Sequence, residues 1–128
     1  MTDITSVVDN YIQVWNETDQ QSRRALIAQV FAEDALYSDP IAAVRGYDAI
    51  DQLISGAQSQ FAGLRFSLAG PVDAHHDQAR FSWQLGQPEA EDPIVIGFDV
   101  AILKNARIQS VYGFLDKVPT AGTSTTSL

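Results

Sequence analysis

The stretch IVIGFDVAIL at residues 94–103 decides the fold. Apolar side chains fall on both of its faces, which is typical of a strand covered on two sides. Much of residues 108–115 has the same character, and Lys104-Asn105 forms a short polar connection between the two stretches. Such a connection is typical of a hairpin. The pattern therefore predicts two neighbouring central strands of an antiparallel sheet.

The rest of the chain divides at Gly63. After it, apolar residues alternate with a period of two in residues 64–68 and 81–85, which predicts two more strands. Before it, they recur at spacings of three and four, which predicts helices over residues 2–17, 20–31 and 46–62. Residues 35–39 are expected to be extended, because a residue that precedes proline is disfavoured in a helix.

Three helices followed by a meander of about four long strands predict an α+β fold. We expect a cone-like, curved antiparallel β-sheet wrapped around a pocket, with the three N-terminal helices packed on its concave face. Residues 1–118 are expected to form a single domain. Residues 119–128, rich in Ser, Thr and Gly, are expected to be a disordered tail.

Composition narrows the classes of function. Sixteen acidic against eight basic residues give a net charge of −8, and the basic residues are scattered along the chain. This negative charge disfavours binding to nucleic acid and to anionic membrane surfaces, so an apolar small molecule is the expected ligand. No run approaches the ~20 apolar residues of a membrane span, and no signal peptide is evident at Met1. The absence of cysteine excludes thiolate chemistry, and the cytoplasm is the expected compartment.

Asp99 is the most informative polar residue. It interrupts the apolar central stretch and shares a strand face with Gly97 and Ala101. Because these two residues are small, this face is expected to leave a void beside the carboxyl group. A buried, unpaired carboxyl group becomes neutral rather than charged, and then donates a hydrogen bond. The alternatives are an ion pair between Asp99 and Arg80, Arg65 or Arg107 of a neighbouring strand, or a carboxylate that points to solvent at the edge of an interface.

Other polar residues are weaker candidates. Asp39 precedes Pro40, which is common for a carboxylate that only stabilises a turn. Tyr11 and Trp15 lie one helical turn apart on a buried face, where core packing is the default role. His75 and His76 lie in a polar connection and are expected to be solvated, so no metal site is predicted.

Several segments together resemble the nuclear transport factor 2-like superfamily, and within it ketosteroid isomerase and the SnoaL-like polyketide cyclases. The stretches that carry the resemblance are Phe31-Ala32-Glu33-Asp34-Ala35 leading to Asp39-Pro40, Gly46 at the start of the third helix, residues 64–72, Asp99-Val100, and residues 107–111. The resemblance spans residues 4–116.

By this resemblance, Asp39 takes the position of the isomerase's general base. Asp99 takes that of the protonated acid that stabilises an enolate, a case known from ketosteroid isomerase itself. Either Tyr11 or Trp15 takes the position of the second donor. Leu53, Val95, Gly97, Val111, Gly113 and Leu115 fall on substrate-binding positions, and Phe81 and Trp83 are expected to reach the same interior from the adjacent strand.

Some positions depart from the family. Phe31 and Ile54 replace two tyrosines that support the phenol in some isomerases, and the segment from Asp39 to Gly46 is shorter. Gly97 stands where limonene epoxide hydrolase carries an arginine, which disfavours epoxide hydrolysis.

Two hypotheses about function follow. The first is a cofactor-independent isomerase or cyclase that acts on an apolar ketone, steroid-like or polyketide-like. The second is a small-molecule-binding or assembly module of the same fold without catalytic activity. Neither requires a cofactor, and the resemblance implies a homodimer formed through the outer sheet face around Ile96, Phe98, Ile102, Tyr112 and Phe114.

Overall fold

The computed structural model describes residues 3–88 and 92–119. Its helices are α1 (Ile4–Asn16), α2 (Gln20–Val30) and α3 (Tyr47–Gln60). Its strands are β1 (Phe31–Ser38), β2 (Ala43–Arg45), β3 (Arg65–Leu68), β4 (Asp73–His75), β5 (Gln78–Gly86), β6 (Val95–Lys104) and β7 (Arg107–Lys117). Residues 120–128 of the expected tail lie outside the described part of the chain.

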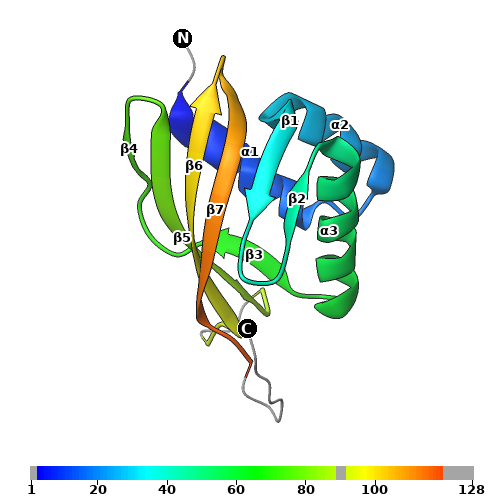
Figure 1. The fold of residues 1–128 in the computed structure, drawn as a ribbon. Coiled ribbons are helices and arrows are strands. Elements are labelled where there is room, and N and C mark those ends of the chain that lie inside the picture. Colours follow the sequence, from blue (N-terminus) through cyan, green and yellow to red (C-terminus); the bar gives the residue numbers. More distant parts are fainter. Residues whose placement is uncertain (1–2, 89–91, 120–128) are drawn as a thin grey trace.

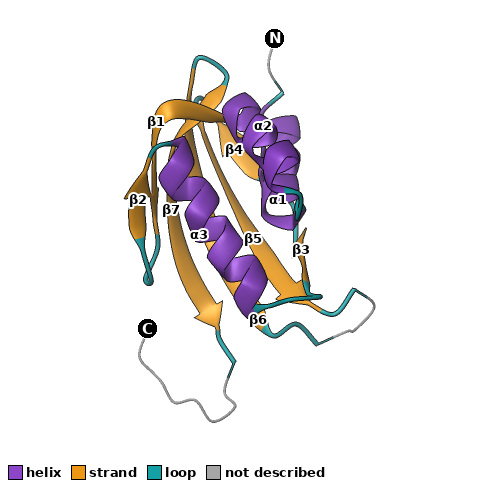
Figure 2. Ribbon diagram, turned by 90° about the vertical axis from the view of Figure 1, so that its right-hand side faces the viewer, coloured by secondary structure: helices purple, strands orange, loops and turns teal. Residues whose placement is uncertain are grey.

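The strands form one curved sheet in the order β2-β1-β7-β6-β5-β3, with β4 paired to β5 (Figure 1). All three helices lie against one face of this sheet (Figure 2). The expected α+β architecture of three helices on a curved sheet is confirmed. The sheet is mixed rather than wholly antiparallel, because the segment that precedes Asp39 forms β1, which pairs in parallel with β7.

Strand β6 is the centre of the sheet and sets its two faces. It pairs antiparallel with β5 on one side and with β7 on the other, as its apolar pattern predicts. Its side chains alternate between buried and half-buried from Val95 to Ile102. Asp99 therefore points into the layer between the sheet and the helices, where it is 2% exposed.

The helices begin where the sequence provides caps. The carboxylates of Asp3 and Asp19 accept hydrogen bonds from the backbone N–H groups of Thr5 and Ser22, at 3.1 and 2.9 Å. Gly46 precedes α3 with a φ of 92°, a conformation that favours glycine.

Helix α2 ends earlier than its apolar spacing predicts. Phe31 was expected on its buried face, but it begins β1, where it lies opposite Ile108 of β7. Both side chains are fully buried. Strand pairing with β7 thus overrides the local helical pattern.

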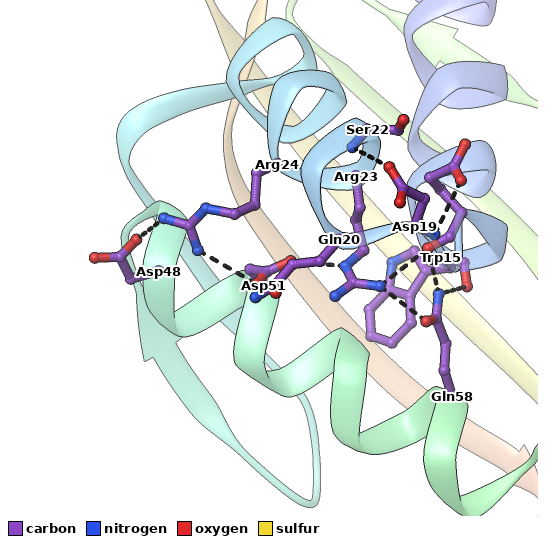
Figure 3. Close-up of polar contacts among 10 residues, drawn as sticks. Trp15, Asp19, Gln20, Ser22, Arg23, Arg24, Asp48, Asp51 and Gln58 are labelled. Carbon is purple, nitrogen blue, oxygen red and sulfur yellow. Dashed lines mark hydrogen bonds and ion pairs between the residues drawn. The ribbon is translucent and has the colours of Figure 1, made fainter.

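A buried ion pair joins α2 to α3. The guanidinium Nε of Arg23 donates to Oδ1 of Asp51 at 2.6 Å, and both side chains are at most 3% exposed (Figure 3). The neighbouring Arg24 also contacts Asp51 and pairs with Asp48, but it is far more exposed. Burial raises the pKa of Asp51, but the hydrogen bonds from Arg23 and Gln20 outweigh it, so this pKa is lowered.

None of the helices in the described residues is long and apolar enough to cross a membrane.

Replacing Arg23 by Met should destabilise the protein by about 3–5 kcal/mol, because the buried Asp51 carboxylate loses its only buried cationic partner among the described residues. Chemical denaturation measures this change. Arg24→Met is the matched control on the same helix and should have a much smaller effect. The double variant Arg23→Met/Asp51→Leu should recover much of the loss. A single variant as stable as wild type would contradict the assignment of Arg23 and Asp51 as a required pair.

Candidate active site

The site is built around a buried hydrogen bond between α1 and β6. The hydroxyl of Tyr11 donates to Oδ2 of Asp99 at 2.8 Å, and each residue is 2% exposed. Tyr11 reaches Asp99 because it lies on the buried face of α1 with Val7, Val8 and Val14. The other oxygen of Asp99, Oδ1, has no hydrogen-bond partner among the described residues. Asp99 does not form the alternative ion pair with Arg80, which contacts Asp73 at the surface instead.

Strand β5 supplies the neighbours of Asp99. In the register between β5 and β6, Phe81 lies opposite Asp99 and Trp83 lies opposite Gly97. Phe81 also packs edge-on against the ring of Tyr11, with ring centroids 5.7 Å apart. Residues 81 and 83 thus reach the interior beside Asp99.

The space over Gly97 is filled. An added Cβ at Gly97 would lie only 2.1 Å from Cζ2 of Trp83, so the indole ring occupies the place of a side chain. The prediction of a void at Gly97 is therefore wrong. Because Gly97 has no side chain, the Trp83 ring of the neighbouring strand β5 fits into this space. The indole Nε1 of Trp83 is buried without a hydrogen-bond partner in the described structure.

Asp39 closes a tight turn after β1. Its Oδ1 accepts hydrogen bonds from the backbone N–H groups of Ile41 and Ala42, both at 2.9 Å. Its Oδ2 accepts one from the hydroxyl of Tyr37 at 2.7 Å. A carboxylate has about four acceptor positions, so one remains on Oδ2.

Gly113 of β7 lies against the side chains of both Asp99 and Asp39. An added Cβ at Gly113 would lie 2.8 Å from Oδ1 of Asp99 and 3.3 Å from Cβ of Asp39. Both side chains therefore contact the same point above the β7 backbone. Any residue larger than glycine would push them out of these positions.

Burial dominates the electrostatics of Asp99. It raises the pKa of this carboxyl group to about 6, while the indole of Trp83 and the hydroxyl of Tyr11 act in the opposite direction and the charge of Asp39 raises it further. The Trp83 N–H is thus close enough to influence Asp99, although it lies outside hydrogen-bond geometry. Burial, followed by the charge of Asp99, raises the pKa of Tyr11 well above its usual value. The phenol therefore remains protonated and able to donate.

Trp15 lies near the hydrogen-bonded Tyr11 and Asp99. Tyr11, not Trp15, holds the hydrogen bond to Asp99. The ring of Trp15 packs between those of Tyr37 and Phe66, at centroid distances of 5.6 and 5.3 Å. Its Nε1 is buried with no hydrogen-bond partner in residues 3–88 and 92–119, so it is a second unused donor near the phenol.

The remaining expected pocket residues lie in two environments. Val95 and Val111 are buried in the core, whereas Leu53 of α3 and Leu115 of β7 are half-buried and pack against it. Phe31 and Ile54, at the positions of the family's supporting tyrosines, are fully buried apolar residues.

Tyr37 is a site residue that the sequence patterns did not single out. Its hydroxyl holds Asp39, and the side chain is 3% exposed. Burial, followed by the charges of Asp99 and Asp39, raises its pKa well above the usual value. The spacing of two residues between Tyr37 and Asp39 in an extended segment was the available signal, since such residues share a face.

The Asp99→Asn variant should flatten the dependence of stability on pH. The folded pKa of Asp99, about 6, lies above the unfolded value of 3.8. The stability that this group contributes is therefore fully present below pH 3.8 and is lost as the pH rises to 6. Between these two pH limits, the contribution of Asp99 to the free energy of unfolding changes by roughly 3 kcal/mol at most. Urea denaturation from pH 3.5 to 7.5 measures it.

The matched control is Asp116→Asn, an exposed carboxylate on β7, which should keep the wild-type profile. Identical profiles for Asp99→Asn and wild type would contradict a raised pKa at Asp99.

Comparisons with known proteins identify the family of this chain. The family model of the SnoaL-like domain matches residues 8–110. A candidate isomerase of the SnoaL-like family from Agrobacterium tumefaciens is 40% identical, with a TM-score of 0.82 over 88% of this chain and 96% of that one. No curated protein matches the sequence.

More distant structures share the fold. A candidate polyketide cyclase from Sinorhizobium meliloti is 19% identical, with a TM-score of 0.65 over 84% of this chain and 93% of that one. A protein from Catenulispora acidiphila with a ketosteroid isomerase-like fold, solved with trimethylamine, is 18% identical, with a TM-score of 0.69 over 88% and 85% of the two chains. The match over residues 8–110 and the 40% identical structure establish that this chain belongs to the SnoaL-like domain family, within the nuclear transport factor 2-like superfamily.

Proposed function

We propose that this protein is a cofactor-independent isomerase or cyclase that acts on an apolar ketone. The observation that carries the proposal is the buried Tyr11–Asp99 hydrogen bond, which leaves Oδ1 of Asp99 unpartnered in the described structure, with Asp39 beside it above Gly113. Two carboxyl groups in such different surroundings suit two different roles in proton transfer.

Asp39 would act as the base. The free acceptor position on Oδ2 of Asp39 would take a proton from the carbon next to the carbonyl group of the ketone. The electrons of that C–H bond would form a carbon–carbon double bond, and those of the carbonyl would move to its oxygen. In an isomerase, Asp39 would then return the proton to a different carbon, so that nothing is consumed.

Protonated Asp99 would donate its proton in a hydrogen bond to the enolate oxygen. Tyr11, whose one hydroxyl proton is bonded to Oδ2 of Asp99 in the free protein, would turn this proton to the enolate oxygen when the ligand binds. Donors held in place before the reaction stabilise the negative charge that develops on that oxygen. With a pKa of about 6, Asp99 is protonated below that pH in the free protein. An apolar ligand would displace water from the site and raise this pKa further, because desolvation disfavours the charged form.

Turnover of a β,γ-unsaturated ketone tests the proposal. Asp39→Asn should lower kcat by roughly 10²–10⁴-fold, the contribution of a positioned general base. Asp99→Ala should also lower it, whereas Asp116→Asn should have no effect. Conversion is followed by the absorbance of the conjugated product. Equal rates for Asp39→Asn and wild type would remove Asp39 from the role of base.

A second candidate function is a binding module without catalysis. Two observations favour it: the Trp83 indole fills the space over Gly97, and Asp39 already accepts three hydrogen bonds. This alternative expects hydrophobic ligands to raise the melting temperature without turnover of any carbonyl substrate. An activity that is lost on Asp99→Ala would contradict it.

We also propose that the protein forms a homodimer through the outer sheet face. Tyr112 and Phe114 are 43% and 57% exposed on β7. The half-buried Ile96, Phe98 and Ile102 lie on the same side of the adjacent β6. Light scattering at micromolar concentration should give twice the monomer mass. The Phe114→Ser variant should give a lower mass, because it weakens the dimer. A wild-type monomer under these conditions would contradict the proposal.

A further inference from the structure

The C-terminal end of α1 is held by side chains from other helices. Nε2 of Gln58, on α3, donates to the backbone carbonyls of Trp15 and Glu17 at 3.0 and 2.8 Å (Figure 3). Nη1 of Arg23, on α2, donates to the carbonyl of Glu17 at 3.1 Å. Carbonyls at a helix end lack partners within their own helix, so these bonds complete the end of α1.

Gln58 is itself fixed by the buried ion pair. Nη1 of Arg23 donates to its Oε1 at 2.9 Å, which orients the amide so that Nε2 faces α1. Nε of the same guanidinium is held by Asp51. The position of Gln58 therefore depends on a buried residue of α2 and on a buried residue of its own helix.

A second anchor lies at the same end of α1. The side chain of Asn16 pairs with the backbone of Phe66 in β3: Nδ2 donates to the carbonyl at 2.9 Å, and Oδ1 accepts from the N–H at 2.8 Å. The end of α1 is thus held between α3 and the sheet.

Water or a following glycine satisfies such carbonyls in many helices, and either would leave the helix free to shift. Side-chain donors from α2 and α3 also satisfy these carbonyls, and in addition they fix the position of α1 relative to those two helices. Tyr11 is one turn before Trp15, and its hydroxyl must lie 2.8 Å from Asp99. A movement of α1 that lengthens this distance by about 1 Å would take the two oxygens beyond hydrogen-bond distance.

We propose that Gln58, oriented by Arg23, is a positioning residue that sets α1 so that the Tyr11 hydroxyl meets Asp99. The value of this positioning for catalysis rests on the function proposed above, but the positioning itself does not.

The groups that act on Asp99 come from other elements than α3. They are Tyr11 from α1, Trp83 from β5 and Asp39 from the turn after β1, and Asp99 in turn acts on Tyr37. Gln58 carries no charge and is not among the groups that shift the pKa of Asp99. Any effect of Gln58 on Asp99 must therefore pass through the placement of α1.

The test measures the pKa of Asp99 by carboxyl-region NMR titration in wild type, Gln58→Met, Tyr11→Phe and the double variant. Gln58→Met should raise it by about half to one unit, because Asp99 loses the hydrogen bond that stabilises its charged form. Tyr11→Phe should have a similar effect, and Gln58→Met should add nothing in the Tyr11→Phe background. The matched control is Gln52→Met, an exposed glutamine on the same helix, and it should leave the pKa unchanged.

A merely structural role predicts a different pattern. Gln58→Met would then lower the melting temperature and leave the pKa of Asp99 at its wild-type value, which would overturn the proposal. The proposal would also be overturned if Gln58→Met shifted the pKa of Asp99 by the same amount in the Tyr11→Phe background as in the wild-type protein. If Gln58→Met does not fold, Gln58→Asn, which shortens the amide by one methylene group, provides the same test with the same expected sign. No turnover is measured, so a failure here is distinct from a failure of the proposed function.

Discussion

A carboxyl group in the middle of the central strand is the constraint on which this structure depends. Asp99 is 2% exposed, and no basic side chain of the described residues pairs with it. Burying such a group is unfavourable unless it is protonated or hydrogen-bonded. The structure meets this requirement with the phenol of Tyr11 at 2.8 Å and with a raised pKa. The placement of α1 against the sheet is tied to this bond.

Two glycines on the same sheet face make the surroundings of Asp99 possible. Gly97 admits the Trp83 indole, and Gly113 admits the side chains of Asp39 and Asp99. In both cases the missing Cβ makes room for a functional group of another strand rather than for empty space. The interior of the sheet is therefore occupied by polar groups held among aromatic rings, and a ligand would have to fit against them.

The sequence patterns predicted the backbone better than the contacts. The apolar character of residues 94–103 predicted the burial of Asp99, and alternation in residues 81–85 predicted that Phe81 and Trp83 point inward. The patterns could not show that Trp83 fills the space over Gly97, because strand register is fixed by pairing and not by local spacing. They also extended α2 through Phe31, whose conformation is set by pairing with Ile108 of β7.

The most direct test of this account is the titration of Asp99 in the wild-type protein. Carboxyl-region NMR with the Asp99→Asn variant for assignment follows this single group from pH 3 to 8. The account predicts an apparent pKa of about 6, as expected for a buried carboxyl group that Tyr11 stabilises only in part. A pKa below 4 would mean that Asp99 is a charged residue stabilised by its surroundings, and it would contradict the role of a protonated donor.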